Sequence, residues 1–177
     1  MKKILLLIFA LCISVAEAKL TLENKKILTV YYSLTGSTKS GAITVQKEVG
    51  GDIFELIQET PYPANYQEAV RVSRNDVETD FKPTLKGNPK NIAQYDIIFL
   101  GSPIWFGQVA PAVKTFLSEN DLSGKTIIPF VSHGGGGKSK SEDIIKRLAP
   151  KSNVLSVKQF RGKATENEIK EWIKDYK

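Results

Sequence analysis

Residues 25–39 read KKILTVYYSLTGSTK, and this stretch decides the fold. An apolar, β-branched and aromatic run up to Tyr32 predicts a strand, and hydroxyl residues with one glycine follow it directly. A helical spacing of small and apolar residues then begins, with Ala42, Val45 and Val49 on one side. The stretch therefore predicts a strand, a tight loop and a helix, in that order.

The loop over residues 33–38 has the composition of an anion site. Where a loop opens a helix, backbone N–H groups and the positive end of the helix dipole point at the same place. Hydroxyl groups can donate further hydrogen bonds to phosphate oxygens, and a plain capped turn needs fewer of them. The loop therefore predicts a phosphate site, and its hydroxyls belong to Ser33, Thr35, Ser37 and Thr38.

The first 18 residues have the pattern of a secretory signal peptide. A basic start, Met1-Lys2-Lys3, precedes the largely apolar run Ile4–Val15 and the cleavage pattern Ala16-Glu17-Ala18. A membrane anchor needs roughly 20 apolar residues, and this run is shorter. A lipoprotein anchor at Cys12 is the other option, although Leu11 stands where such signals usually carry a small residue. We expect cleavage after the signal and a mature protein in the periplasm.

Residues 19–177 have the length of one domain. Cys12 is the only cysteine and would leave with the signal, so no disulfide, thiolate nucleophile or cysteine metal site is expected. The formal net charge is +6, and the basic residues are scattered, which argues against nucleic acid as a partner. A mildly basic solvated surface is the simplest interpretation, and an acidic partner or an anionic membrane surface is the alternative.

Strand patterns and helix patterns alternate along the rest of the chain. Such alternation predicts an α/β fold, a doubly wound parallel sheet of five strands with helices on both faces. Pro129 is awkward for a central strand, because it has no N–H to give to the ladder. Strands are expected near residues 27–32, 52–57, 95–100, 126–131 and 154–160.

The helices between these strands carry their own signals. Tyr66, Ala69, Val70, Ser73 and Val77 mark the packed face of one helix. Another helix has a proline, Pro111, at a position suited to its first turn. Capping boxes are expected at the starts of the last two helices, formed by Ser139 with Glu142 and by Thr165 with Glu168.

Three unusual loops follow the first, third and fourth strands. They span residues 33–38, 101–107 and 132–137. Ligands of doubly wound sheets bind outside the carboxyl ends of the strands, at the point where the strand order reverses. We therefore expect the three loops to meet at one site.

Two of these loops resemble the flavin loops of the flavodoxin-like family. Ser33-Leu34-Thr35-Gly36-Ser37-Thr38 is similar to the flavodoxin phosphate loop, and Gly101-Ser102-Pro103-Ile104-Trp105-Phe106-Gly107 resembles the second flavin loop. The resemblance covers nearly all of residues 19–177. It implies a flavodoxin-like sandwich with strand order 2-1-3-4-5, one noncovalent FMN, and electron or hydride transfer at the isoalloxazine ring.

The resemblance also implies which residues bind the cofactor. The first loop would hold the phosphate, and the second would touch the ring, with Trp105 or Phe106 stacking on it. The glycines of the third loop would let the backbone come close to the ring. The implied cofactor-binding residues are Ser33, Leu34, Thr35, Gly36, Ser37, Thr38, Ser102, Pro103, Ile104, Trp105, Phe106, Gly107, Ser132, His133, Gly134 and Gly135.

The third loop also resembles two other motifs, but the surrounding features that each motif requires are missing from this sequence. Residues 132–139 nearly match a nucleotide P-loop, but they do not follow the first strand. His133-Gly134-Gly135-Gly136 matches the oxyanion loop of some lipases, but no serine lies in a nucleophile elbow. His133 is the one candidate catalytic residue, because histidine is the side-chain type that can act as a proton donor or a substrate contact near neutral pH; an exposed histidine without a role is the alternative. No metal site is expected.

Three functions are compatible with these patterns. The first is an FMN-dependent oxidoreductase that reduces quinones or similar small acceptors, favoured because the third loop has no aromatic residue to close the second face of the ring. The second is an electron carrier between protein partners. The third is a flavin-free binding module on the same fold, against which the hydroxyls of residues 33–38 argue. The expected partner is therefore a redox protein or a small electron acceptor.

Overall fold

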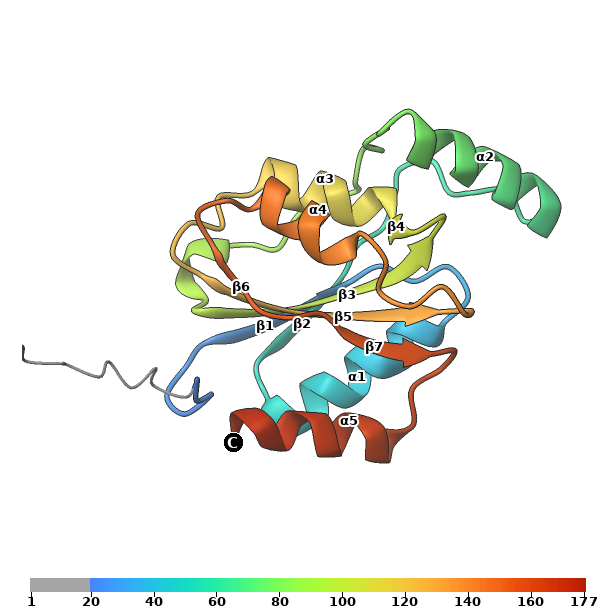
Figure 1. The fold of residues 1–177 in the computed structure, drawn as a ribbon. Coiled ribbons are helices and arrows are strands. Elements are labelled where there is room, and N and C mark those ends of the chain that lie inside the picture. Colours follow the sequence, from blue (N-terminus) through green and yellow to red (C-terminus); the bar gives the residue numbers. More distant parts are fainter. Residues whose placement is uncertain (1–19) are drawn as a thin grey trace, which may run out of the picture.

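The computed structural model describes residues 20–177, so the expected signal peptide, residues 1–18, lies outside the described residues. A parallel sheet forms the middle layer (Figure 1), with α1 and α5 on one face and α3 and α4 on the other. The strands are β1 (Ile27–Tyr31), β2 (Asp52–Glu55), β3 (Ile97–Trp105), β4 (Gln108–Val109), β5 (Thr126–His133), β6 (Asn153–Val154) and β7 (Lys158–Arg161). The helices are α1 (Ser37–Val49), α2 (Tyr66–Glu78), α3 (Pro111–Glu119), α4 (Ser141–Leu148) and α5 (Glu166–Ile173), with short 3₁₀ turns η1 (Ile92–Gln94) and η2 (Lys174–Tyr176).

The order of the strands across the sheet is β2-β1-β3-β5-β6, with β7 also paired to β5. Since β5 is the fourth long strand and β6 and β7 together take the fifth place, the predicted order 2-1-3-4-5 is confirmed. All of these pairs are parallel; β4 alone pairs antiparallel, with the end of β3. The strand order reverses between β1 and β3, which places a ligand site at their carboxyl ends.

The fifth strand is not continuous, and Pro129 gives the reason. The carbonyl of Ile127 on β5 accepts a hydrogen bond from the N–H of Leu155, which follows β6. Pro129 lies two residues further along β5, so its backbone faces the same neighbouring strand. Pro129 offers no N–H there, and β6 ends at Val154 while β7 begins only at Lys158. The expected single strand over residues 154–160 is therefore wrong, and the break in the strand lies beside the proline.

Of the two expected capping boxes, one is confirmed. The side chain of Thr165 accepts from the backbone N–H of Glu168, whose carboxylate accepts from the N–H of Thr165 in return. The box expected at Ser139 and Glu142 is wrong, because Ser139 lies in a left-handed turn with φ +44° and α4 begins only at Ser141. Pro111 occupies the first turn of α3, as expected.

Buried side chains on both faces of the sheet hold the layers together. On one face Phe99, Phe130 and Trp172 pack at tilted or edge-on angles with ring centroids 5.8–5.9 Å apart, which joins α5 to β3 and β5. On the other face Phe116 of α3 and Ile145 of α4 close the core. No helix within residues 20–177 is both long and apolar enough to cross a membrane.

Candidate functional site

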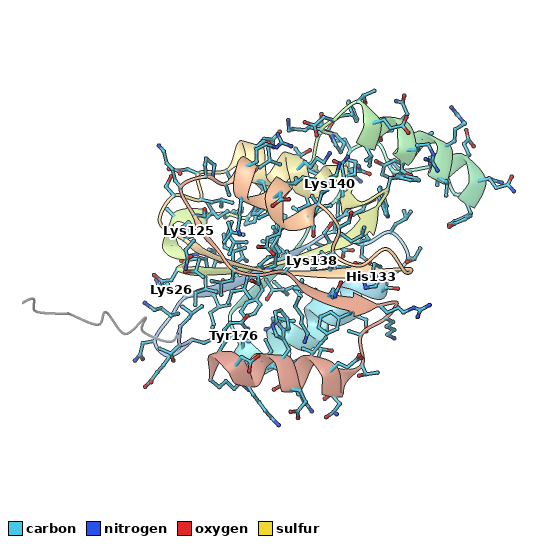
Figure 2. All side chains as sticks on the ribbon, in the orientation of Figure 1. Lys26, Lys125, His133, Lys138, Lys140 and Tyr176 are labelled. Atoms are coloured by element: carbon cyan, nitrogen blue, oxygen red, sulfur yellow. The ribbon has the colours of Figure 1, made fainter. Side chains whose placement is uncertain are left out.

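A pocket of about 430 Å³ lies at the carboxyl ends of the strands, where the switch point predicts a ligand. The three predicted loops meet there. Figure 2 places His133 at the end of the sheet opposite to Lys26 and Lys125, which stand near the amino ends of β1 and β5. The pocket is lined by Ser33, Leu34, Thr35, Ser37, Thr38, Tyr66, Ala69, Val70, Ser73, Pro103, Ile104, Trp105, Phe106, Ser132, His133, Gly134 and Gly162.

The loop between β1 and α1 leaves backbone donors free at the start of the helix. Gly36 has φ +88°, a conformation that glycine adopts without strain, and its N–H donates to the Ser33 hydroxyl at 3.1 Å. No side chain caps α1, and among the described residues the N–H groups of Ser37, Thr38 and Lys39 have no hydrogen-bond partner. The loop therefore supplies donors for an anion and no internal acceptor for them.

One of the predicted hydroxyls serves the scaffold. Thr38 is 2% exposed, and its hydroxyl forms a hydrogen bond of 2.7 Å with that of Ser132. This bond ties the first loop to the third across 94 residues of chain. Both side chains also line the pocket, so the bond fixes the relative position of two of its walls.

The second predicted loop is in fact the end of a long strand and a tight hairpin. β3 continues through Trp105, so the expected loop boundaries, residues 101–107, are wrong. The chain reverses at Phe106 and Gly107, with φ +47° and +79°, and returns as β4. A left-handed conformation is strained for a phenylalanine, whereas hairpin turns of this kind favour asparagine and glycine. The hairpin therefore holds an aromatic ring at its tip at some energetic cost.

The two aromatic residues of this hairpin have different surroundings. Trp105 packs edge-on against Tyr32 and Tyr62, with ring centroids 5.6 and 5.1 Å apart. Phe106 is 40% exposed, and the guanidinium of Arg74 on α2 lies 4.3 Å from the centre of its ring. Trp105 is thus a fixed wall, and Phe106 is the aromatic ring that remains accessible from solvent.

Four of the predicted cofactor-binding residues do not line the pocket. The hydroxyl of Ser102 lies in the core, where it accepts from the N–H of Ala110 and donates to the carbonyl of Pro103. These hydrogen bonds of Ser102 hold the base of the β3–β4 hairpin in place. The other three are Gly36, Gly107 and Gly135, which shape their loops.

His133 is held in one orientation by the glycine loop. Its Nδ1 accepts the backbone N–H of Gly137 at 3.2 Å, and Gly137 has φ +62°. Since Nδ1 is an acceptor, the proton of the neutral imidazole is on Nε2. The glycine loop therefore makes His133 a hydrogen-bond donor in the wall of the pocket.

Helix α2 forms a wall that the sequence analysis missed. Ala69, Val70 and Ser73 line the pocket, although their helical spacing is also typical of an ordinary core face. Tyr66 was expected to pack in the core and is 74% exposed, at the rim. The sequence analysis also missed Gly162, which lines the pocket and follows β7 directly. Its position just after the last strand could have indicated that it lies at the ligand-binding end of the sheet.

Glu142 on α4 joins the glycine loop to the rest of the sheet. Its carboxylate accepts from Lys138 and Lys146, each at 2.8 Å, and from the N–H of Val157 at 3.4 Å. These hydrogen bonds from Lys138 and Lys146 lower the pKa of Glu142 from its usual 4.5 to about 2. The folded-state value is the lower one, so this stabilisation is present above pH 4.5 and is lost as the pH falls towards 2.

Replacing Glu142 by glutamine should therefore lower the free energy of unfolding at pH 7 by about 1 kcal/mol, since the carboxylate is mostly but not fully buried. The difference between wild type and variant should shrink at pH 3. Urea unfolding at both pH values measures it. An equal difference at pH 7 and pH 3 would show that the ionised carboxylate is not the cause.

The described residues contain no cluster of three His, Cys, Asp or Glu side chains that could hold a metal ion. The site therefore consists of backbone donors, hydroxyls, aromatic rings and one histidine. Such a set can bind a phosphate at one end and a flat apolar ring at the other.

Comparison with known proteins agrees with this geometry. A crystal structure from Bacteroides eggerthii DSM 20697, described provisionally as a flavoprotein, shares 30% identity over 85% of this chain and 97% of its own, with a TM-score of 0.73. A similarly described protein from Bacteroides uniformis ATCC 8492 shares 29% over 85% and 98%, with a TM-score of 0.75. A flavoprotein from Lactobacillus acidophilus NCFM, crystallised in complex with FMN, has the same fold at 24% identity over 84% and 98%, with a TM-score of 0.68.

The family profile described as flavodoxin matches residues 26–176, which is nearly every residue that the structure describes. The match includes the loop before α1, the β3–β4 hairpin and the glycine loop. The protein whose loops meet in this pocket is a member of the flavodoxin family.

Proposed function

We propose that this protein binds FMN in the pocket and uses it to reduce a small acceptor such as a quinone. The observation that supports this most is the start of α1, where three unpartnered N–H groups and the hydroxyls of Thr35 and Ser37 border an apolar, aromatic-lined pocket. A phosphate fits the donors, and a flat ring fits the space between Trp105, Phe106 and the third loop. The complex of the L. acidophilus flavoprotein with FMN supports the same assignment.

Different residues of the pocket would bind different parts of FMN. Residues 33–38 would bind the phosphate, Trp105 and Phe106 would contact the ring, and Gly134 would allow a close backbone approach. FMN supplies the redox chemistry, because it can accept and pass on electrons singly or in pairs. The protein contributes binding, orientation and exclusion of water.

The α2 wall favours a reductase over a carrier. Ala69, Val70 and Ser73 extend the pocket beyond the loops, and His133, whose Nε2–H is available as a donor, lines the same pocket. A small molecule with a carbonyl oxygen would find both an apolar surface and a hydrogen-bond donor there. A carrier between proteins remains the second candidate, supported by the exposed ring of Phe106 at the rim.

Two measurements test this function. The purified protein, incubated with FMN and desalted, should be yellow, and anaerobic reduction followed by addition of a quinone should reoxidise it within a turnover time of seconds or less. A protein that stays colourless would contradict FMN binding. A yellow protein that returns electrons to a redox protein but not to quinones would support the carrier instead.

His133 can be tested with two matched substitutions. His133→Gln places an amide donor near the position of Nε2, whereas His133→Asn keeps an acceptor near Nδ1 and removes the donor. We expect the glutamine variant to retain most of the quinone reductase activity and the asparagine variant to lose about tenfold in kcat/KM, the equivalent of one hydrogen bond. Equal losses in both variants would show that the donor has no such role.

We further propose export, from the signal pattern of residues 1–18. Expression in a bacterium with both membranes should yield a periplasmic protein shorter by those residues. Intact mass spectrometry of the periplasmic fraction measures this, and an unprocessed protein in the cytoplasm would contradict it.

A further inference from the structure

A second cavity, of about 440 Å³, lies beside α2 and shares no lining residue with the pocket proposed for FMN. The segment before α2, residues 58–63, and the segment after it, residues 81–84, form two of its walls, and Val72 and Asp76 of α2 form the third. The N–H of Glu59 donates to the carbonyl of Thr84 at 2.9 Å, which holds the two segments side by side. Small-molecule sites have volumes of about 300–1,000 Å³, so this cavity is large enough for a ligand of its own.

Aromatic rings and prolines give the second cavity apolar walls. Tyr62 is half-buried, and Phe81, which is 51% exposed, is a large apolar side chain that a ligand can still cover. The backbone N–H of Phe81 donates to the carbonyl of Asp76 at 2.9 Å, which fixes the turn after α2. Prolines at positions 61, 63 and 83 also line the cavity and restrict the backbone of both segments. An apolar ring would therefore be shielded from water by walls that are already in place.

The charge of the second cavity is opposite to that of the protein as a whole. The formal net charge is +6, yet the residues that line this cavity include two acids, Glu59 and Asp76, and no lysine, arginine or histidine. Within residues 20–177 neither acid forms an ion pair. Lys82, which follows Phe81 in the chain, lies 3.9 Å from Asp80 instead. The cavity thus carries negative charge that no cation of the described chain compensates.

Asp76 is held in place through one of its two oxygens. The hydroxyl of Tyr62 donates to Asp76 Oδ2 at 2.8 Å, and Oδ1 accepts no hydrogen bond from any residue within 20–177. Burial, and next the hydrogen bond to Asp76, raise the pKa of Tyr62, so its hydroxyl keeps its proton near neutral pH. A phenol that stays protonated leaves the charge of the carboxylate uncompensated. The second oxygen of Asp76 can therefore accept a charged hydrogen bond from a ligand.

We propose that the second cavity binds a small organic cation, an amine carried on an aromatic or other apolar ring. The ammonium group would pair with Asp76 and Glu59, and the ring would lie against Tyr62 and Phe81, whose aromatic faces also attract a cation. Tyr62 packs edge-on against Trp105 of the other pocket, with ring centroids 5.1 Å apart, so the amine would lie behind the Trp105 wall. The proposal does not rest on the proposed function, because FMN would occupy the other pocket.

The compound 2-phenylethylamine can serve as the probe, with 2-phenylethanol as its uncharged counterpart. Added to the ¹⁵N-labelled protein incubated with FMN, the amine should shift the amide signals of Glu59, Tyr62, Asp76 and Phe81 and bind with a dissociation constant of about 1 mM or below. The alcohol should bind at least about tenfold more weakly, because it has no charge for the two acids. Equal affinities of the amine and the alcohol would overturn the proposal.

Glu59→Gln/Asp76→Asn removes both charges, while the asparagine still offers an oxygen to the hydroxyl of Tyr62. We expect this double variant to bind the amine at least about tenfold more weakly and the alcohol within about twofold of wild type. The matched control is Glu166→Gln/Glu171→Gln, the same change of charge at two exposed positions on α5, across the sheet from α2 (Figure 1). It should change amine binding less than about twofold. Equal losses in both double variants would overturn the proposal, because net charge alone would then explain the binding.

The amide signals also show where the amine binds. Shifts confined to Ser37, Thr38 and His133 would place it in the FMN pocket, and unchanged signals of the second cavity at about 10 mM amine would show that it takes no such ligand. Either result would overturn the proposal. FMN binding is read on the same sample from its flavin absorbance after removal of free FMN. A colourless protein that binds the amine as expected would contradict the proposed function alone, and a yellow protein that does not bind the amine would contradict only the second site.

Discussion

Replacing Ser37 by aspartate should weaken FMN binding at least about 100-fold, or about 2.7 kcal/mol, without destabilising the protein. Ser37 is the first residue of α1 and lines the pocket. A carboxylate there would lie within a few ångströms of the bound phosphate, and like charges about 4 Å apart repel by about 4 kcal/mol near a protein surface. The same carboxylate suits the positive end of a helix, so the free energy of unfolding should stay unchanged or rise by about 0.5 kcal/mol.

Riboflavin provides the control for this substitution, because it carries the same ring without the phosphate. Its affinity should change less than about twofold in Ser37→Asp, since no repulsion arises. Ser37→Ala, which removes only a hydroxyl, should weaken FMN binding less than about tenfold. Flavin fluorescence titration measures all of these affinities. If FMN and riboflavin lost affinity equally, the phosphate would not be at the start of α1.

Asp80→Asn should lower the free energy of unfolding by about 2 kcal/mol, although Asp80 is half exposed. The reason is Lys114 of α3, which is completely buried and donates to Asp80 Oδ1 at 2.8 Å and to Gln108 Oε1 at 2.7 Å. Without the carboxylate, a buried ammonium would keep only neutral acceptors. Asparagine is the right replacement because Asp80 has φ +53°, which asparagine also adopts readily.

The reverse substitution should behave differently. Lys114→Met leaves behind a carboxylate that water can still reach, so it should cost less than about 1 kcal/mol. The double variant Asp80→Asn/Lys114→Met should recover most of the stability lost in Asp80→Asn. Urea unfolding of the four proteins measures the cycle. A double variant no more stable than Asp80→Asn would show that the buried charge is not responsible.

Lys114 also bears on the pocket, because its two partners belong to elements that form the pocket walls. Asp80 lies two residues after the end of α2, and Gln108 begins β4 after the Phe106–Gly107 turn. The lysine thus holds the helical wall and the hairpin to α3. Together with the contact of Arg74 on Phe106, it gives α2 a defined place beside the site.

The fold was predictable from the sequence because strand and helix patterns alternate without interruption. The order of the strands followed from the resemblance and is confirmed. The interruption of the fifth strand was not predicted, because the effect of Pro129 depends on which neighbour its missing N–H faces. The end of β3 was misplaced for a similar reason: Gly101-Ser102-Pro103 reads as a loop, yet the pairing of Gly101 with Phe130 and Ser102 with Val131 continues the ladder.

The parts of the candidate site that follow from where the loops lie along the chain were predictable from the sequence. The parts that depend on how side chains pack in the folded protein were not. The three loops follow strands, so their convergence could be inferred from topology. The wall formed by α2 could not, because an apolar helix face has the same spacing whether it covers a core or a ligand. The hydroxyls of Thr38 and Ser102 looked available in the sequence, but both are bonded within the protein.

The central claim is that the start of α1 holds the phosphate of FMN. The most direct measurement is an amide ¹H–¹⁵N spectrum of the labelled protein, recorded with and without one equivalent of FMN. The largest shifts should belong to the N–H groups of Ser37, Thr38 and Lys39, and riboflavin should leave those three signals nearly unchanged. Absence of shifts at these amides with FMN, or equal shifts with riboflavin, would contradict the assignment.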